Sequence, residues 1–137
     1  MDAAAVLDHL RRLNATAAFN RWAGFEVVAA QPGEVALRLP WRADLGQYAG
    51  TLHAGLMSAL VDTACGYAAH TAVGSRVVAS HCAVDYVAPG TGTAFVATAR
   101  VVKAGRRQIF TRAEVHGDRD GEPVLIAIGS TILIPLG

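Results

Sequence analysis

A single carboxylate, Asp62, stands in an otherwise uncharged and largely apolar stretch of the chain that covers residues 47–69. No lysine or arginine occurs between Arg42 and Arg76, so no cation close in sequence can neutralise it. Burying an unpaired carboxylate costs several kcal/mol, which a raised pKa relieves in part. Because this cost must be offset, a buried aspartate without a partner indicates a carboxylate that takes part in the function. The alternatives are that Asp62 caps the amides of another element or faces water at a subunit edge.

The turn ahead of Asp62 has the composition of an anion-binding helix start. Residues 50–55 read GTLHAG, and a helix is predicted from residue 53 to about residue 71. Unpaired backbone N–H groups and the helix dipole favour negative charge at such a start. The turn could therefore hold the oxygen of a carbonyl under attack. His53 alone would more often be a capping or packing residue, and its combination with Asp62 makes it a catalytic candidate.

Hydrophobic patterning predicts an ordered series of helices and strands around this centre. Apolar spacing indicates one amphipathic helix or two short ones in residues 2–22, ending near Gly24. A hairpin with strands at 25–31 and 34–41 follows, about the turn Pro32-Gly33. After a loop at 42–50 and the helix at 53–71, strands are expected at 77–87, 93–103, 107–116 and 123–134, with loops at 104–106 and 117–122.

Burial requirements combine these elements into one architecture. The helix at 53–71 is apolar nearly all round, so it should be buried all round. A six-stranded antiparallel sheet curled around it would achieve this, which predicts one α+β domain over residues 1–137. The last strand is apolar on both faces and should be central or at an interface. Alternation on the strand at 77–87 predicts that Val77, Ala79, His81, Ala83 and Asp85 share one face.

Composition narrows the classes of function. Hydrophobic residues make up 53% of the chain and charged residues only 17%, which points to a partner surface, most simply a second copy. A net charge of +1 gives no overall field for nucleic acid or an anionic membrane. No signal peptide or membrane span is recognised. Cys65 and Cys82 lie in apolar segments, which indicates reduced, buried thiols in a cytoplasmic protein, although a bridge between them stays open.

Metal and cofactor chemistry finds little support in the sequence. His81 and Cys82 are neighbours on a predicted strand and would point to opposite faces. No spacing typical of zinc ligands links His53, His70 and His81. No phosphate-binding glycine loop, dinucleotide fingerprint or G-x-S-x-G elbow occurs. We therefore expect neither a metal nor a cofactor.

Three segments of the chain carry a resemblance to a known family. The run GTLHAGLMSALVDTACGYAA resembles the active-site motif of hotdog-fold acyl-CoA thioesterases of the PaaI-like type, in which a G-x-x-H-G-G turn leads into a long helix with D-T-A near its middle. The runs ASHCAVDYVAPG and VVKAGRRQIF resemble later segments of that family, in the same order. The resemblance covers the chain from about residue 45 to its end and implies a hotdog fold.

The resemblance also implies roles for individual residues. Asp62 would be the nucleophile or general base, and His53 with the N–H groups of Ala54 and Gly55 would polarise the thioester carbonyl. Gln47 would orient the attacking water or the thioester, and Thr63 would form hydrogen bonds near the site. Ala54 replaces the first glycine of the usual pair, which preserves the oxyanion hole only if residue 54 is helical. The sites would be shared between two subunits of a homodimer or homotetramer.

Substrate contacts follow from the same resemblance. Lys103, Arg106 and Arg107 could bind the phosphates of coenzyme A, although a solvated hairpin tip is an equally good explanation of each residue. Ser80 or His81 could line the acyl pocket. The leading hypothesis is hydrolysis of an acyl-CoA thioester. The alternatives are a hotdog module that binds acyl-CoA or an acyl carrier without turnover, a hotdog hydratase or dehydratase, and a structural protein with a tolerated aspartate.

Overall fold

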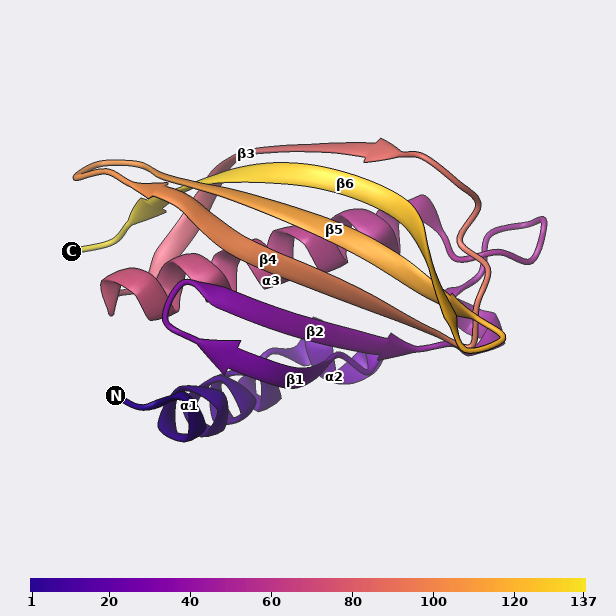
Figure 1. Cartoon of the computed structure of the whole chain (residues 1–137), viewed down its shortest axis with the longest axis horizontal. Helices are drawn as coiled ribbons and strands as arrows, with labels where there is room; N and C mark the ends of the chain where they lie inside the picture. Colours follow the sequence, from indigo (N-terminus) through magenta and orange to yellow (C-terminus); the bar gives the residue numbers. More distant parts are fainter.

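Helix α3 (Ala54–Val73) lies along the inner face of a six-stranded antiparallel sheet that wraps around it (Figure 1). The computed structural model describes all residues 1–137. Its other helices are α1 (Ala3–Thr16), α2 (Ala18–Ala23) and a short 3-10 helix (Ala43–Leu45), and its strands are β1 (Glu26–Gln31), β2 (Glu34–Pro40), β3 (Val77–Tyr86), β4 (Ala94–Ala104), β5 (Ile109–Arg119) and β6 (Glu122–Pro135). The strand order is β1-β2-β4-β5-β6-β3, so the predicted fold is confirmed.

The ends of the helices follow local capping rules. The His53 side chain caps the start of α3, and Gly74 ends it with φ 73, where a residue without a Cβ is favoured. Asp2 caps α1 through a 2.8 Å hydrogen bond from the N–H of Ala5. Helix α2 ends at Gly24 with φ 91, as the sequence predicts.

The core lies between α3 and the inner face of the sheet. Leu60, Val61 and Ala64 of α3 are fully buried, and Phe95 of β4 is buried with them. Strand β6 approaches the helix so closely that a Cβ on Gly129 would lie 2.8 Å from Cγ1 of Val61. Strand β6 pairs with β5 on one side and β3 on the other, so it is an interior strand, in agreement with the first of the two alternatives predicted for it.

A buried polar triad joins the N-terminal helices to α3. The Asn20 Nδ2 atom donates to the Tyr67 hydroxyl over 2.9 Å, and that hydroxyl donates to Oδ1 of Asn14 over 2.7 Å. Asn20 Nδ2 also donates to Oδ1 of Asn14 over 2.9 Å. Burial raises the pKa of the Tyr67 hydroxyl, which therefore stays protonated and can donate. Helix α1 also packs beside β1 and covers that edge of the sheet (Figure 1).

The prediction that the central helix is buried all round is wrong for the single chain. Gly55 and Asp62 are exposed, and Ser58, Thr63 and Gly66 on the same side are only partly buried. The physical reason is that one curled sheet covers one side of a helix and leaves the opposite stripe open. The chain alone therefore does not bury Asp62.

A β-bulge in β3 overturns the predicted alternation on that strand. Ala79 pairs with Leu133, but His81 pairs with the next residue, Ile132, so Ser80 is an extra residue. Leu133 is buried against α3, and its partner Ala79 faces the helix. Beyond the bulge the faces exchange, so His81 points away from α3.

Two smaller predictions also need correction. Strand β5 continues through Arg119, and the turn to β6 consists of Asp120 and Gly121, both with positive φ, so the predicted loop at 117–122 is too long. Cys82 is exposed because β3 is an edge strand, whereas it was predicted to be buried. Cys65 is buried as predicted, and burial raises the pKa of its thiol to about 11. Both thiols are free.

Candidate active site

Asp62 lies at the edge of a groove of about 460 Å³ between α3 and β3. The lining residues come mainly from these two elements: Leu13, Asp62, Thr63, Gly66, Tyr67, His70, Arg76, Val77, Val78, Ala79 and Leu133. Asp62 forms no ion pair and no side-chain hydrogen bond within the chain. Its neighbours in the groove remove part of its water, and this desolvation raises the pKa of its carboxyl.

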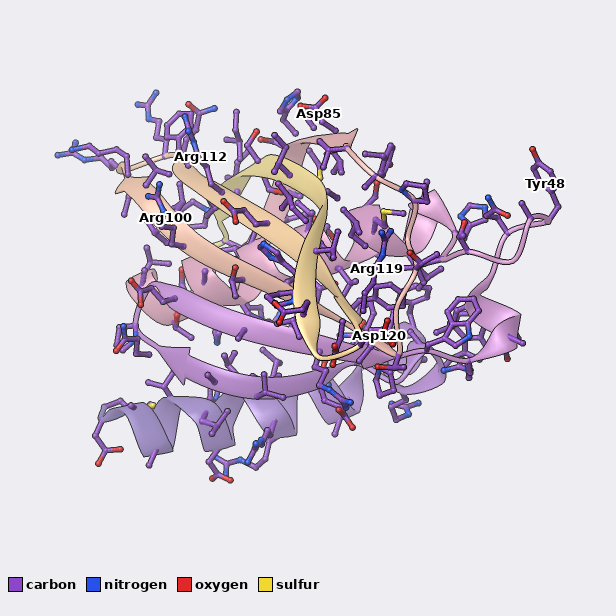
Figure 2. The ribbon with its side chains drawn as sticks, turned by 45° about the vertical axis from the view of Figure 1, so that its right-hand side comes forward. Tyr48, Asp85, Arg100, Arg112, Arg119 and Asp120 are labelled. Carbon is purple, nitrogen blue, oxygen red and sulfur yellow. The ribbon has the colours of Figure 1, made fainter.

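A larger hollow lies elsewhere, on the outer face of the sheet. It has a volume of about 890 Å³, and Arg100, Arg112 and Asp85 lie on its wall (Figure 2). Arg100 and Arg112 are direct cross-strand neighbours and neither forms an ion pair. Its lining mixes both signs of charge, with the carboxylates of Glu34, Asp85 and Glu114 beside the two arginines. The smaller groove contains Asp62, whose carboxyl has a pKa raised by desolvation, and it is therefore the candidate site.

The start of α3 presents a defined set of hydrogen-bond donors. The N–H of Gly55 donates to Nδ1 of His53 over 2.8 Å, so the neutral ring carries its proton on Nε2. A Cβ on Gly55 would lie 2.9 Å from that Nδ1 atom, which explains the glycine. Ala54 is helical and has no positive φ, so it satisfies the condition for replacing the first glycine of the motif. Its N–H, at the first helical position, has no acceptor one turn earlier within the helix.

The loop before α3 is held in place by backbone hydrogen bonds. The N–H of His53 donates to the carbonyl of Leu45 over 3.0 Å, and the N–H of Leu52 donates to the carbonyl of Gly90 over 2.9 Å. The Gln47 N–H donates to the carbonyl of Thr51 over 2.8 Å, and its side-chain oxygen accepts from the N–H of Ala49. The Nε2 group of Gln47 has no partner within the chain and is available to a ligand.

Asp62 and the start of α3 do not meet within one chain. Asp62 follows Ala54 by eight positions, which corresponds to about 12 Å along the helix axis. One carbonyl cannot contact the carboxylate and the helix-start donors across that distance. A site that uses both groups needs the helix start of a second chain.

Comparison with known proteins identifies the family. The sequence profile of the thioesterase superfamily matches residues 49–124, which is more than half of the chain. The chain belongs to the thioesterase superfamily. The matched region includes the helix-start turn, Asp62 and most of the sheet.

Individual relatives agree with this thioesterase assignment. A thioesterase family protein of Silicibacter pomeroyi, solved by crystallography, is 32% identical, with a TM-score of 0.91 over 96% of this chain and 98% of its own. A Halobacterium salinarum protein whose name proposes an esterase is 32% identical over 119 residues, or 77% of this chain and 76% of its own. PaaI of E. coli, from the phenylacetic acid degradation operon, is 23% identical with a TM-score of 0.81 and shares the fold.

The remaining predicted residues of this thioesterase lie in several places. Thr63 lines the groove beside Asp62. Ser80 forms the bulge and donates to the carbonyl of Ile132 over 3.3 Å, and neither it nor His81 lines the groove. Lys103, Arg106 and Arg107 lie at and beside the β4–β5 hairpin tip, at the end of the sheet opposite the start of α3 (Figure 1).

Two residues near Asp62 were missed by the sequence analysis. The Ser58 hydroxyl, one helical turn before Asp62, forms a hydrogen bond with the hydroxyl of Tyr86. Spacing alone could have identified Ser58, but the pairing with Tyr86 depends on the sheet register. Arg76 lines the same groove as Asp62, although fourteen positions separate them in sequence. Its place on the groove depends on how β3 packs beside α3.

Three further observations concern the side-chain clusters, the helices and the surface of this thioesterase. No three His, Cys, Asp or Glu side chains come close enough to hold a metal ion together. None of its helices combines the length and the apolar character needed to cross a membrane. Tyr48, at the tip of the loop before α3, is fully exposed and projects into solvent (Figure 2).

Proposed function

We propose that this thioesterase hydrolyses an acyl-CoA thioester to a free acid and coenzyme A, with Asp62 as nucleophile or general base. One observation carries the proposal: an unpaired carboxylate with a raised pKa lies at the edge of a groove on the open side of α3. A pKa above the ordinary range suits a group that must exchange protons during the reaction.

Two routes are compatible with the carboxylate. In the first, an Asp62 oxygen attacks the thioester carbonyl, the C–S bond breaks, coenzyme A leaves as a thiolate, and water hydrolyses the mixed anhydride. In the second, Asp62 takes a proton from water as the water oxygen attacks the carbonyl. The C–S bond then breaks, and the thiolate of coenzyme A takes up the proton held by Asp62. Both routes place a negative charge on the carbonyl oxygen, which N–H donors at a helix start would stabilise.

The donors come from a second copy of the chain in this proposal. The start of α3 in one protomer faces Asp62 of the other, since the same groups within one chain lie about 12 Å apart. The donors are the Nε2–H of His53 and the N–H of Ala54, and Gly55 supports them by donating to Nδ1 of His53. Gln47, on the fixed loop before α3, would orient the water or the thioester with its unpartnered Nε2 group. The free edge of β3, with its exposed Val78 and Tyr86, is the surface through which two copies would pair. The minimal unit is a homodimer, and a tetramer is a pair of such dimers.

The proposal also covers the binding of coenzyme A, the cellular location and the residues beside the acyl group. Lys103, Arg106 and Arg107 are exposed cations at one end of the sheet and would bind the phosphates of coenzyme A. Residues 1–137 form one domain in this scheme, and the enzyme works in the cytoplasm, where two free cysteines stay reduced. Ser80 and His81 lie outside the groove of their own chain and could line an acyl pocket only across an interface.

The test is the Asp62→Asn variant, assayed by thiol release with aryl, short, medium and long acyl-CoAs. We expect a loss of at least about a thousandfold in kcat, with an unchanged circular dichroism spectrum. Asp85→Asn, on the outer face of the same sheet, is the matched control and should keep full turnover. Near-full turnover by a folded Asp62→Asn protein would refute the proposal. Tight binding without thiol release would indicate a binding module, and hydration of an enoyl-CoA would indicate a hydratase.

A further inference from the structure

The groove beside Asp62 continues along the second half of α3 toward His70 and Arg76. Gly66, one turn beyond Asp62, contributes no side chain, and a Cβ there would meet only Cδ2 of Leu133 at 3.7 Å. Apolar side chains line the rest of this length, with Leu13 of α1, Val77 of β3 and Leu133 of β6 among them. The groove therefore has room for an apolar chain that extends away from the reacting carbonyl.

Most polar groups along this length already have partners inside the protein. The Tyr67 hydroxyl bonds with Asn14 and Asn20. The Nδ1 atom of His70 donates to the carbonyl of Ser75 over 2.7 Å, and its Nε2 therefore accepts from Nε2 of His9 over 2.9 Å. Both ring nitrogens of His70 are thus occupied, and neither His70 nor Tyr67 is free to bind an acyl group.

Arg76 is the exception at the far end of the groove. Its guanidinium forms no ion pair and no hydrogen bond within the chain. The arginine–carboxylate pairs that do form in the protein lie away from this groove. Its backbone is fixed between the end of α3 and the start of β3, where its carbonyl accepts from the N–H of Leu136 over 2.8 Å. A fixed backbone with an unpartnered cation presents a positive charge to whatever fills the groove.

The two charged groups of the groove lie at different ends. Asp62 and His70 are separated by about 12 Å of helix, and Arg76 follows six residues after His70, beyond the end of α3. Physiological salt screens most of the interaction between exposed charges that lie more than about 8 Å apart. A molecule that suits this groove has a reactive carbonyl at one end, an apolar middle and an anion at the other end.

We propose that Arg76 is a specificity-determining residue that selects acyl groups ending in a carboxylate. The proposal rests on the thioester hydrolysis proposed above and names the substrate class for the same site, an ω-carboxyacyl thioester. The guanidinium fork matches a carboxylate with two parallel N–H···O hydrogen bonds, a geometry that neither a lysine nor a neutral side chain reproduces fully. A methyl-ended acyl group of the same length would leave Arg76 without a partner.

The test compares two thioesters of equal chain length, an ω-carboxyacyl-CoA and its methyl-ended counterpart. We expect the wild-type enzyme to favour the carboxyacyl thioester about threefold in kcat/KM, because Arg76 is exposed and water weakens a charged pair at such a site. Arg76→Gln should remove this preference, and Arg76→Lys should restore part of it. Arg112→Gln is the matched control, since Arg112 is also unpaired but lies on the outer face of the sheet. It should leave the preference unchanged.

Calorimetric binding to the Asp62→Asn variant separates this inference from the proposed reaction. Tighter binding of the carboxyacyl-CoA, lost in the Asp62→Asn/Arg76→Gln double variant, supports the role of Arg76 even if no thioester is hydrolysed. Hydrolysis of both thioesters without a preference for the carboxylate would overturn the inference while the proposed reaction stands. An equal loss for both thioesters in Arg76→Gln would also overturn it, because that pattern indicates a structural role.

Discussion

The Nδ1 atom of His53 accepts a 2.8 Å hydrogen bond from the backbone N–H of Gly55. The N–H of Gly55, which the family resemblance predicts to be part of the oxyanion hole, is therefore occupied in the structure. Two donors at the start of α3 remain for a ligand: the N–H of Ala54 and the Nε2–H of His53. His53 thus acts as a helix cap through one ring nitrogen and can act as a hydrogen-bond donor through the other.

Substitution of His53 by asparagine or alanine separates these two functions. Asparagine is a good N-cap residue and should preserve α3, whereas alanine should lower the free energy of unfolding by about 1 kcal/mol. Both variants lack Nε2–H, so we expect both to lose about 100-fold in kcat. Chemical unfolding and thiol-release kinetics measure the two effects. Wild-type kcat in His53→Asn would limit the histidine to capping.

The raised pKa of Asp62 predicts a pH-dependent cost to stability. The folded state favours the protonated carboxyl, so the stabilisation from this group is complete below its unfolded pKa and is lost as the pH rises through its higher folded pKa. Asp62→Asn, which cannot ionise, should match the wild type below about pH 3.8. At pH 7 the variant should be more stable by less than about 1 kcal/mol, because water screens the exposed side of the carboxylate.

Urea unfolding of both proteins from pH 3 to pH 8 measures that difference. Asp85→Asn controls for the loss of one acidic residue from the sheet surface. A difference between Asp62→Asn and the wild type that is constant across this pH range would contradict the desolvation of Asp62. A wild-type protein that is more stable than Asp62→Asn at pH 7 would contradict it as well.

The sequence predicts the elements well because periodicity and turn chemistry are local. The hairpin about Pro32-Gly33, the helix that follows His53 and the central position of the last strand all rest on such patterns, and all are confirmed. The faces of β3 were predicted wrongly because a single extra residue at Ser80 exchanges them, and alternation in the sequence carries no mark of that bulge.

The sequence predicts only part of the candidate site, because some of its residues come together only through packing of elements far apart in the chain. Asp62 stands out because its neighbours in sequence are apolar, which is a local contrast. The approach of Arg76 to the same groove and the hydrogen bond between Ser58 and Tyr86 depend on how β3 packs beside α3, and each joins residues far apart in the chain. The exposure of Asp62 was only an alternative in the sequence analysis, because the burial argument assumed a cover on every side of the helix.

Substitutions of Gly66 should change both the stability of α3 and the space available in the groove. A Cβ at this position meets only Cδ2 of Leu133 at an ordinary contact distance of 3.7 Å. Gly66→Ala should therefore fold and gain up to about 1 kcal/mol from the higher helix propensity of alanine. Gly66→Leu should fill the groove and raise KM for medium and long acyl-CoAs at least about tenfold, with a smaller effect on acetyl-CoA. Thermal unfolding and a chain-length series measure both effects, and equal KM changes for all chain lengths would contradict an acyl group in this groove.

The separation of about 12 Å between Ala54 and Asp62 along α3 predicts that inactive variants complement each other in a mixed dimer. One chain carries Asp62→Asn and the other carries His53→Ala, and the two are co-expressed with different affinity tags and purified as the mixed species. If Asp62 of one chain works with the helix start of the other, one of the two symmetric sites contains both changes and the other contains neither. The mixed dimer should then show roughly half of the wild-type turnover.

A mixture of Asp62→Asn with Asp62→Ala chains has no intact site in any arrangement and serves as the control. If the site lay within one chain, both sites of the first mixture would be defective, and its turnover would stay at the level of the single variants.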